Sequence, residues 1–318
     1  MQTEAETIRW LASVLRGEAP AWPTSPWDAD SVWSIANENG VLELCYHHLA
    51  DTAQWPAFPE SWRADLTNLA RFQAAQELVQ LRELRAILEI ASQEALSPLL
   101  LKGTALAYRI YPAAHLRPRL DHDILLPQQC SAERLAHRLR DRGYQRPNAI
   151  DGTHISQQST YVKPGLPTHR IDLHWRISNS RYFAAALAHE ELVRDAIPLA
   201  QISPHAKGLS PCHALMHACL HRIGHAHEGL ANRLIWLYDI HLLATELGPS
   251  GLRTFASAAV NAKVAALCLD GLCASREHFL TDLPEPLEKE LRSASKREDV
   301  SAQTFRTRLG VELLQARG

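Results

Sequence analysis

The sequence of 318 residues has few of the features that mark secreted, fibrous or membrane-spanning proteins. Its six cysteines are scattered without a Cys-x-x-Cys pair, which favours reduced thiols over a disulfide framework or a zinc knuckle. The segment from Met1 to Glu6 lacks the basic and apolar stretches of an export signal. No apolar run approaches the roughly 18 residues that a membrane span requires. We therefore expect a cytoplasmic protein with no membrane partner.

An excess of charge of one sign is also missing. The 33 Lys and Arg residues nearly balance the 35 Asp and Glu residues, which leaves a formal net charge of -2. This balance argues against a broad electrostatic footprint for nucleic acid. The composition, 46% hydrophobic and 21% charged, is typical of a globular protein that buries a sizeable core.

The hydrophobic pattern divides the chain into helices, then a small mixed sheet, then helices. Apolar residues recur at helical spacing in the N-terminal part, most clearly from Leu66 to Glu94. Strand patterns follow, the clearest of them from Asp121 to Leu126 and from Arg170 to Ile177. We predict an α+β fold with an N-terminal helical region over 1–95, a core over 96–200 and a C-terminal helical region over 201–318.

Three aspartates in the predicted core are candidates for a metal site. Residues i and i+2 of a strand point to the same face, so Asp121 and Asp123 are expected to present two carboxylates side by side. Asp172, in the alternating segment from Arg170 to Ile177, can add a third from a neighbouring strand. Three anions held together repel one another without a cation, so this arrangement indicates bound Mg²⁺ and a polyphosphate.

A short turn upstream of these aspartates is the candidate phosphate site. Lys102, Gly103 and Thr104 follow a short apolar strand and begin a predicted helix. A helix start offers free backbone N–H groups and the positive end of the helix dipole. His174 is expected on the same strand face as Asp172, within reach of a nucleotide or an acceptor.

These motifs resemble the bacterial family of uncharacterised nucleotidyltransferases, within the larger nucleotidyltransferase superfamily with its DNA polymerase beta-like fold. The resemblance covers roughly 99–243. It is carried by Lys102-Gly103, Tyr111-Pro112, Arg117-Pro118, Asp121-x-Asp123, Asp172-Leu-His174-Trp175 and the helical segment from His217 to Asp239. Two positions depart from the pattern, since Thr104 stands where the superfamily has Ser and His122 where a hydrophobic residue usually lies. Alternation predicts that His122 points to the opposite strand face from Asp121 and Asp123.

The resemblance implies transfer of a nucleoside monophosphate from an NTP to an acceptor, with release of pyrophosphate. Asp121, Asp123 and Asp172 are then the catalytic and metal-binding residues, with two Mg²⁺ ions expected. The residues expected to bind the nucleotide are Lys102, Gly103, Thr104, Arg117 and His174. A small molecule, a peptide or a saccharide is expected as acceptor, in preference to tRNA.

Two other functions remain open at this point. One is a toxin-like nucleotidyltransferase that acts on tRNA or protein, and the other is a nucleotide-binding module that has lost turnover, which the departure at His122 keeps open. Arg222 and His227 also have the Arg-x-x-x-x-His spacing of a helical ribonuclease superfamily.

A row of histidines lies downstream of the core at four-residue spacing. Its members are His213, His217, His221 and His225, with His227 close by. Because they lie along one side of a single helix, they are poorly placed to surround one zinc ion. We expect His217 and His221 to hydrogen-bond between this helix and the core, or to contact the acceptor.

Overall fold

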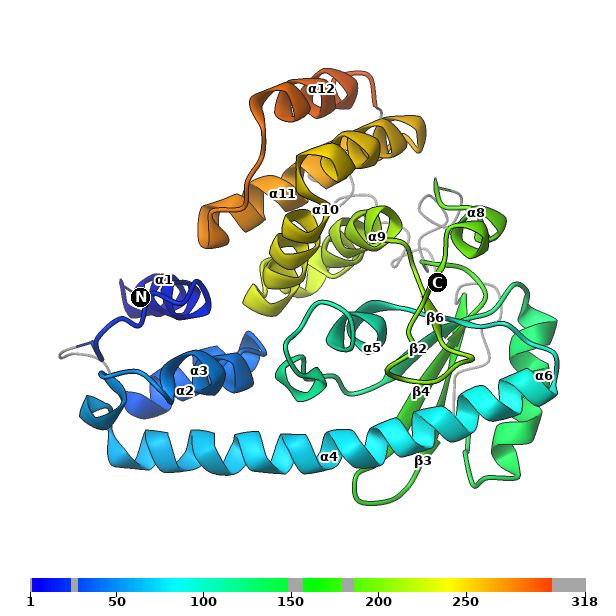
Figure 1. Ribbon diagram of the computed structural model, residues 1–318, viewed down its shortest axis with the longest axis horizontal. Coiled ribbons are helices and arrows are strands. Elements are labelled where there is room, and N and C mark those ends of the chain that lie inside the picture. The colour runs from blue at the N-terminus through cyan, green and yellow to red at the C-terminus, as the bar shows by residue number, and fades with distance from the viewer. Residues whose placement is uncertain (1, 24–27, 148–156, 179–185, 299–318) are drawn as a thin grey trace.

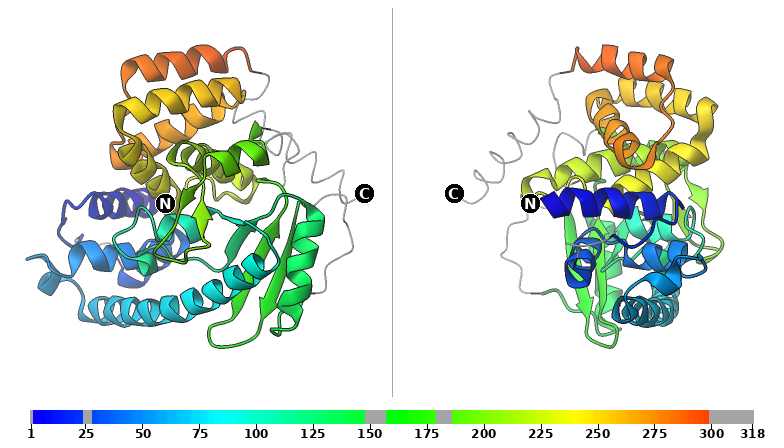
Figure 2. Two further views of the ribbon diagram at one scale, coloured as in Figure 1. Left: turned by 45° about the vertical axis from the view of Figure 1, so that its right-hand side comes forward. Right: turned by 90° about the vertical axis from the view of Figure 1, so that its left-hand side faces the viewer.

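A computed structural model describes residues 2–23, 28–147, 157–178 and 186–298 (Figure 1). Among the described helices, none combines the length and the apolar character needed to cross a bilayer. The molecule has a six-stranded mixed sheet with helices on either side of it (Figures 1 and 2). The predicted α+β class, with a mixed-sheet core between helical regions, is confirmed.

The N-terminal region is helical, as its apolar periodicity predicts. Its elements are α1 (Gln2–Leu15), α2 (Ala29–Glu38), α3 (Leu42–Leu49), the short 3₁₀ helix η1 (Trp55–Ala57) and α4 (Glu60–Gln93). Trp10, Trp22, Phe58 and Trp62 pack ring against ring beneath α1, which fixes α1 against the start of α4. The long helix α4 then runs from this cluster to the underside of the sheet (Figure 1).

The sheet has the strand order β3-β4-β2-β1-β6-β5. Its strands are β1 (Leu99–Leu100), β2 (His122–Leu125), β3 (Gln158–Lys163), β4 (His169–His174), β5 (Ile197–Pro198) and β6 (Lys207–Gly208). The central pairs β2–β4 and β1–β6 are parallel, while β1–β2, β3–β4 and β5–β6 are antiparallel. Between β1 and β2 the chain forms α5 (Lys102–Ala107) and η2 (Ala114–Leu116).

The two faces of the sheet have different partners. Ile124 and Leu173 pack with Ile87 of α4 and Leu135 of α6 (Gln129–Arg140) in one apolar cluster. Leu125 faces the other side and belongs to the larger cluster formed with the C-terminal helices. This division leaves the second face of β2 and β4 available for polar side chains next to α5.

Helices return in the C-terminal region and cover the sheet on the side opposite α4 (Figure 2). They are α8 (His189–Arg194), α9 (Pro211–Gly224), the 3₁₀ helix η3 (Ala226–Glu228), α10 (Leu234–Asn261), α11 (Ala265–Phe279) and α12 (Glu285–Ser295). Within α10 the backbone leaves helical geometry at Gly248, where φ is 59°, and Pro249 follows. This kink lets the second half of α10 turn toward α11.

Several element boundaries differ from the sequence prediction. The predicted strand from Arg170 to Ile177 ends at His174, so Arg176 lies outside it. The strands β5 and β6 were not recognised in the sequence, because a strand of two residues carries no period. Strand β6 also falls beyond 200, the predicted end of the core. The division into three regions at 95 and 200 remains a prediction, and part of its third region, 299–318, lies outside the described residues.

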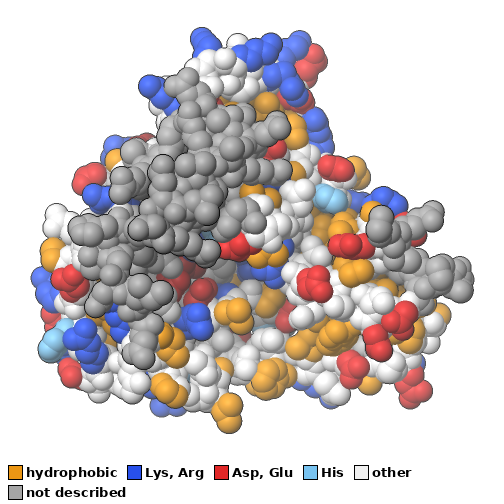
Figure 3. Space-filling view, turned by 180° about the vertical axis from the view of Figure 1, so that it is seen from behind, with side chains coloured by type: hydrophobic (Ala, Val, Ile, Leu, Met, Phe, Trp, Pro, Cys, Tyr) orange, Lys and Arg blue, Asp and Glu red, His pale blue; other side chains and the backbone are white. Residues whose placement is uncertain are grey.

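Charged side chains of both signs are interspersed over the coloured part of the rear face (Figure 3). This mixture agrees with the near balance of acidic and basic residues in the sequence.

Candidate active site

Two aspartates meet on adjacent parallel strands at the centre of the sheet. In the β2–β4 ladder Asp123 is paired with Asp172, and Leu125 is paired with His174. Paired residues of parallel strands point to the same face, so Asp123, Asp172 and His174 lie together. Their ligand atoms lie within 4.8 Å of one another, and all three residues are buried. The sequence prediction that Asp172 comes from a strand next to that of Asp123 is confirmed.

Asp123 is the most highly connected of the three. Its Oδ1 accepts a hydrogen bond from Lys102 Nζ at 2.7 Å and lies 2.8 Å from His174 Nε2. An ionised carboxylate only accepts, so Nε2 is the protonated nitrogen of His174. Burial alone would raise the pKa of Asp123, but the Lys102 charge and the His174 hydrogen bond outweigh it. The pKa of Asp123 is therefore held well below its usual range.

Asp172 is held by neutral donors instead of a cation. Thr160 Oγ1 donates to its Oδ1 at 2.6 Å, and Gln158 Nε2 donates to its Oδ2 at 2.9 Å. Both donors lie on β3, which pairs with β4 at the edge of the sheet. The carboxylate of Asp172 is thus fixed in orientation beside that of Asp123.

Asp121 lies just before β2 and is half-buried. Burial, together with the negative charges of Asp123 and Asp172, raises its pKa to about 7. The side chains at the centre of the site therefore carry more negative charge than Lys102 compensates. Oxygen ligands in this excess fit a hard divalent cation such as Mg²⁺. The group of adjacent ligand atoms, from Asp123, Asp172 and His174, differs from the predicted metal ligands Asp121, Asp123 and Asp172. It contains His174, and Asp121 lies beside it.

The predicted phosphate turn lies at the start of α5, directly against the aspartates. Lys102 has a φ of 49°, a left-handed conformation that is costly for a side chain of this kind. Gly103 lines the same cleft as Lys102. Thr104 is buried, and its hydroxyl lies 3.4 Å from His122 Nδ1. His122 itself is buried on the α4 side of the sheet, as alternation predicts, and burial lowers its pKa to about 3.

A deep cleft of about 1240 Å³ opens over this group of residues. The N-terminal helices contribute one wall, with Glu43 of α3 and Gln76 of α4, and the C-terminal helices contribute another, with His221 and Trp236. Pockets that bind small molecules measure about 300–1,000 Å³, so the cleft has room for a nucleotide and a second ligand. The acidic group at its floor faces that space.

Comparison with known proteins decides the family. A family model described as uncharacterised nucleotidyltransferase matches residues 25–280. The chain belongs to this family. A search among curated proteins finds no match.

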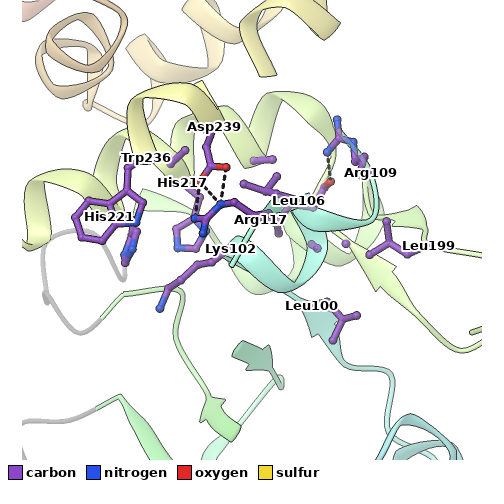
Figure 4. Close-up of a pocket in the computed structure, with 15 residues that line it drawn as sticks. Leu100, Lys102, Leu106, Arg109, Arg117, Leu199, His217, His221, Trp236 and Asp239 are labelled. Carbon is purple, nitrogen blue, oxygen red and sulfur yellow. Dashed lines mark hydrogen bonds and ion pairs between the residues drawn. The ribbon is translucent and has the colours of Figure 1, made fainter. Parts of the chain in front are cut away.

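In this nucleotidyltransferase, Arg117 is bound by a carboxylate that the sequence analysis did not select. Its Nε and Nη2 donate to Asp239 on α10, at 2.9 Å to Oδ1 and 2.7 Å to Oδ2 (Figure 4). The Nη1 group donates to Pro118 O. Tyr111 donates to the same Asp239 Oδ1 at 2.7 Å. Arg117 thus anchors the segment before β2 to α10, and its expected contact with a phosphate remains a prediction.

The histidines of α9 form a row along the cleft wall of the nucleotidyltransferase. His217 and His221 lie next to Lys102, and the ring of His221 lies 5.0 Å from that of Trp236, edge to face (Figure 4). Burial, with help from the Lys102 charge, lowers the pKa of His217 to about 3 and that of His221 well below its usual range. Both rings are therefore neutral at pH 7, and they present aromatic surface without charge.

Arg222, the arginine of the ribonuclease-like spacing, lies in the contact between two helices. Arg222 is buried, and it donates to Asp270 at 2.5 Å and to Asn232 at 2.7 Å, which joins α9 to α11. The side chain of His227 lies outside the described residues. Arg222 therefore has a structural role in helix packing, and this role explains the arginine of the ribonuclease-like spacing.

Asp239 and Trp236 are residues of the site that sequence reasoning missed. Both lie in the first turns of α10, and their pattern in the sequence is that of an amphipathic helix. Asp239 is a carboxylate on an otherwise apolar buried face, between Tyr238 and Ile240. A charged residue in such a position requires a buried partner, and this was the available signal.

Proposed function

We propose that this protein is a metal-dependent nucleotidyltransferase that moves an NMP group from an NTP to an acceptor. An acceptor oxygen attacks the α-phosphorus, the bond from that phosphorus to the bridging oxygen of the β-phosphate breaks, and pyrophosphate leaves. The attacking oxygen loses its proton in the same reaction. The demand on the protein is to position the reactants and to neutralise charge.

The single observation that carries this proposal is the pairing of Asp123 with Asp172 across β2 and β4. Two buried carboxylates side by side, with Asp121 next to them, repel one another. A divalent cation bound between these carboxylates would offset the repulsion. A second support is the membership of the uncharacterised nucleotidyltransferase family.

The carboxylates of Asp121, Asp123 and Asp172 would hold one or two Mg²⁺ ions. When bound, Mg²⁺ neutralises the triphosphate and stabilises charge on the leaving pyrophosphate. His174 fixes the orientation of Asp123 through its Nε2 hydrogen bond. Thr160 and Gln158 do the same for Asp172 from the neighbouring strand.

Lys102 and Gly103 are the residues that we assign to the triphosphate. Lys102 carries an ammonium group at the cleft floor, and Gly103 presents its backbone to the same space. We assign Thr104 and Arg117 to the triphosphate as well. The hydrogen bonds of Thr104 with His122 and of Arg117 with Asp239 would hold these two residues in place. His174, the last of the residues expected to bind the nucleotide, would act on it through its hydrogen bond to Asp123.

The acceptor is proposed to be a small molecule, a peptide or a saccharide. The cleft of about 1240 Å³ exceeds the space that a nucleotide requires, and both of its walls carry side chains far from the aspartates in sequence. A tRNA acceptor would benefit from a continuous basic surface. The mixture of acidic and basic side chains on the drawn rear face does not supply one there (Figure 3).

The test follows the position of a label in the NTP. The protein is incubated with Mg²⁺, fractionated cell extract and each NTP, labelled either at the α-phosphate or at the γ-phosphate. We expect the α label to move to an acceptor and the γ label to appear only in pyrophosphate. Asp123→Asn should lower transfer by at least about a hundredfold, because it removes a carboxylate that would hold the metal ion, and the metal ion would neutralise the reacting phosphates.

Transfer of the γ label would show a phosphotransferase instead. Metal-dependent NTP binding without transfer of either label, across all fractions, would favour a non-catalytic nucleotide-binding module. Label on tRNA or on protein would identify the toxin-like alternative.

A further inference from the structure

Lys102 places its ammonium group in the centre of the acidic group. Its Nζ lies 2.7 Å from Asp123 Oδ1, and His174 Nε2 approaches the same oxygen at 2.8 Å. The charges of Asp121 and Asp172 also act on Lys102. The side chain thus provides a resident positive charge where the carboxylates are most crowded.

The backbone that holds this side chain is itself unusual. Lys102 has a φ of 49°, a left-handed conformation that is unfavourable for a residue with a side chain. Such strain persists where surrounding contacts or function require it. The conformation directs the side chain from the end of β1 toward Asp123 on β2, across the edge of the cleft.

The ammonium group is also able to leave. The Lys102 side chain is 23% exposed while that of Asp123 is only 4% exposed, so the lysine reaches Asp123 from the open side. Lys102 lines the cleft, where a polyphosphate would offer it other oxygens. A flexible lysine stem allows its charge to move by several ångströms without a change in the backbone.

We propose that Lys102 is a displaceable counter-ion, which neutralises Asp123 until a metal–nucleotide complex arrives and then transfers its ion pair to the polyphosphate. The inference rests on the proposed function and adds to it a coupling between metal binding and nucleotide binding. A metal ion and the ammonium group compete for Asp123, so metal alone binds weakly. The nucleotide removes this competition by supplying phosphate oxygens to Lys102, so the two ligands bind with positive coupling.

The experiment measures Mn²⁺ binding by the loss of the free-ion EPR signal, with and without a non-transferable α,β-methylene NTP analogue. Lys102→Met should bind Mn²⁺ alone about tenfold more tightly than wild type, because the competing cation is gone. With the analogue present, this advantage should disappear, so the coupling between Mn²⁺ and the analogue should fall by about tenfold.

Lys163→Met is the matched control. Lys163 also forms a half-buried ion pair, with Nζ 2.9 Å from Glu83 and 28% of its side chain exposed, but Glu83 and Lys163 do not line the cleft. Its removal should leave Mn²⁺ affinity and coupling unchanged. Lys102→Gly is a second variant that accepts the positive φ without strain, and it should repeat the result of Lys102→Met.

Three results overturn the inference: unchanged Mn²⁺ affinity in both Lys102 variants, weaker affinity, or equal tightening with and without the analogue. Equal tightening would mean that Lys102 stays on Asp123 when the nucleotide binds. Asp123→Asn separates this failure from failure of the proposed function. If this variant binds Mn²⁺ as wild type does, the metal site itself is wrong, whatever the behaviour of Lys102.

Discussion

At the scale of single residues, the protein buries ionisable groups and gives most of them partners. Asp123, Asp172 and Arg117 are each held by two or more hydrogen bonds. Glu43 differs, because it is only 4% exposed and lines the cleft with no cation recorded beside it in the described chain. Burial raises the pKa of Glu43 from 4.5 to about 7. A buried carboxyl group of this kind lowers stability when it ionises.

The free energy of unfolding should therefore depend on pH through the ionisation of Glu43. In the folded state the carboxyl is protonated below about pH 7, whereas in the unfolded chain it ionises above pH 4.5. Its penalty is absent below the unfolded value and grows as the pH rises through both values. Glu43→Gln should thus stabilise the protein by roughly 1–3 kcal/mol at pH 8 and have little effect at pH 4.

Thermal unfolding of both proteins across this pH range measures the difference. Glu290→Gln, at an exposed position in the middle of α12, is the control and should show no such trend. Equal stability of Glu43→Gln and wild type at pH 8 would contradict the account of Glu43.

Sequence could predict the aspartates at this scale but not their partners. The alternation of β2 and β4 fixes the face of Asp121, Asp123 and Asp172, because the side-chain period of a strand is local. The pairing of Arg117 with Asp239 joins residues 122 positions apart, and no local pattern encodes it. The direction of the Lys102 side chain likewise depends on a left-handed φ that few lysines adopt.

At the scale of elements, α10 positions the floor of the cleft through Asp239. This carboxylate binds both Arg117 and Tyr111 on the segment that precedes β2. The side chains of Arg117 and Asp239 are 8% and 6% exposed. The segment before β2 is therefore tied to a helix of the C-terminal region.

Asp239→Ala should be strongly destabilising, because it leaves the Arg117 charge buried without its partner. Breaking a buried pair in this way costs about 3–5 kcal/mol. Denaturant unfolding provides the measurement. As a control, Glu285→Ala removes the exposed ion pair with Lys289, whose side chains are 77% and 75% exposed, and should cost less than about 1 kcal/mol. A similar small loss for Asp239→Ala would show that Arg117 does not depend on this pair.

Elements with many periods were predictable and very short ones were not. The helix α4, of 34 residues, repeats its apolar stripe often enough to be recognised from sequence. Strands β5 and β6 exist because β6 pairs with β1 in parallel, a contact across more than a hundred residues. Tertiary pairing creates these strands, and local propensity carries no record of it.

At the scale of the whole molecule, the three predicted regions share one apolar core. Leu66 of α4, Leu101 before α5, and Leu215 of α9 all belong to the same buried cluster. The cleft likewise takes its walls from helices before and after the sheet. The site is therefore a property of the complete fold and not of the central sheet alone.

The central segment should consequently fail to fold by itself. A fragment over 96–210 contains all six strands but lacks α4 and α9, so the apolar faces of β2 and β4 lose their cover. We expect no cooperative thermal transition by circular dichroism, while the full chain shows one. A cooperative transition in the fragment would indicate an independent domain.

The central claim is that Asp123 and its neighbours form a metal-dependent NTP site, and thermal unfolding with each NTP, with and without Mg²⁺, tests it most directly. A ligand at about 100 times its dissociation constant adds about 2.7 kcal/mol, enough to raise the melting temperature by several degrees. We predict an increase that requires Mg²⁺, occurs in wild type and in the control Asp51→Asn at an exposed position, and vanishes in Asp123→Asn. An increase that persists in Asp123→Asn, or none with any NTP, would contradict the account.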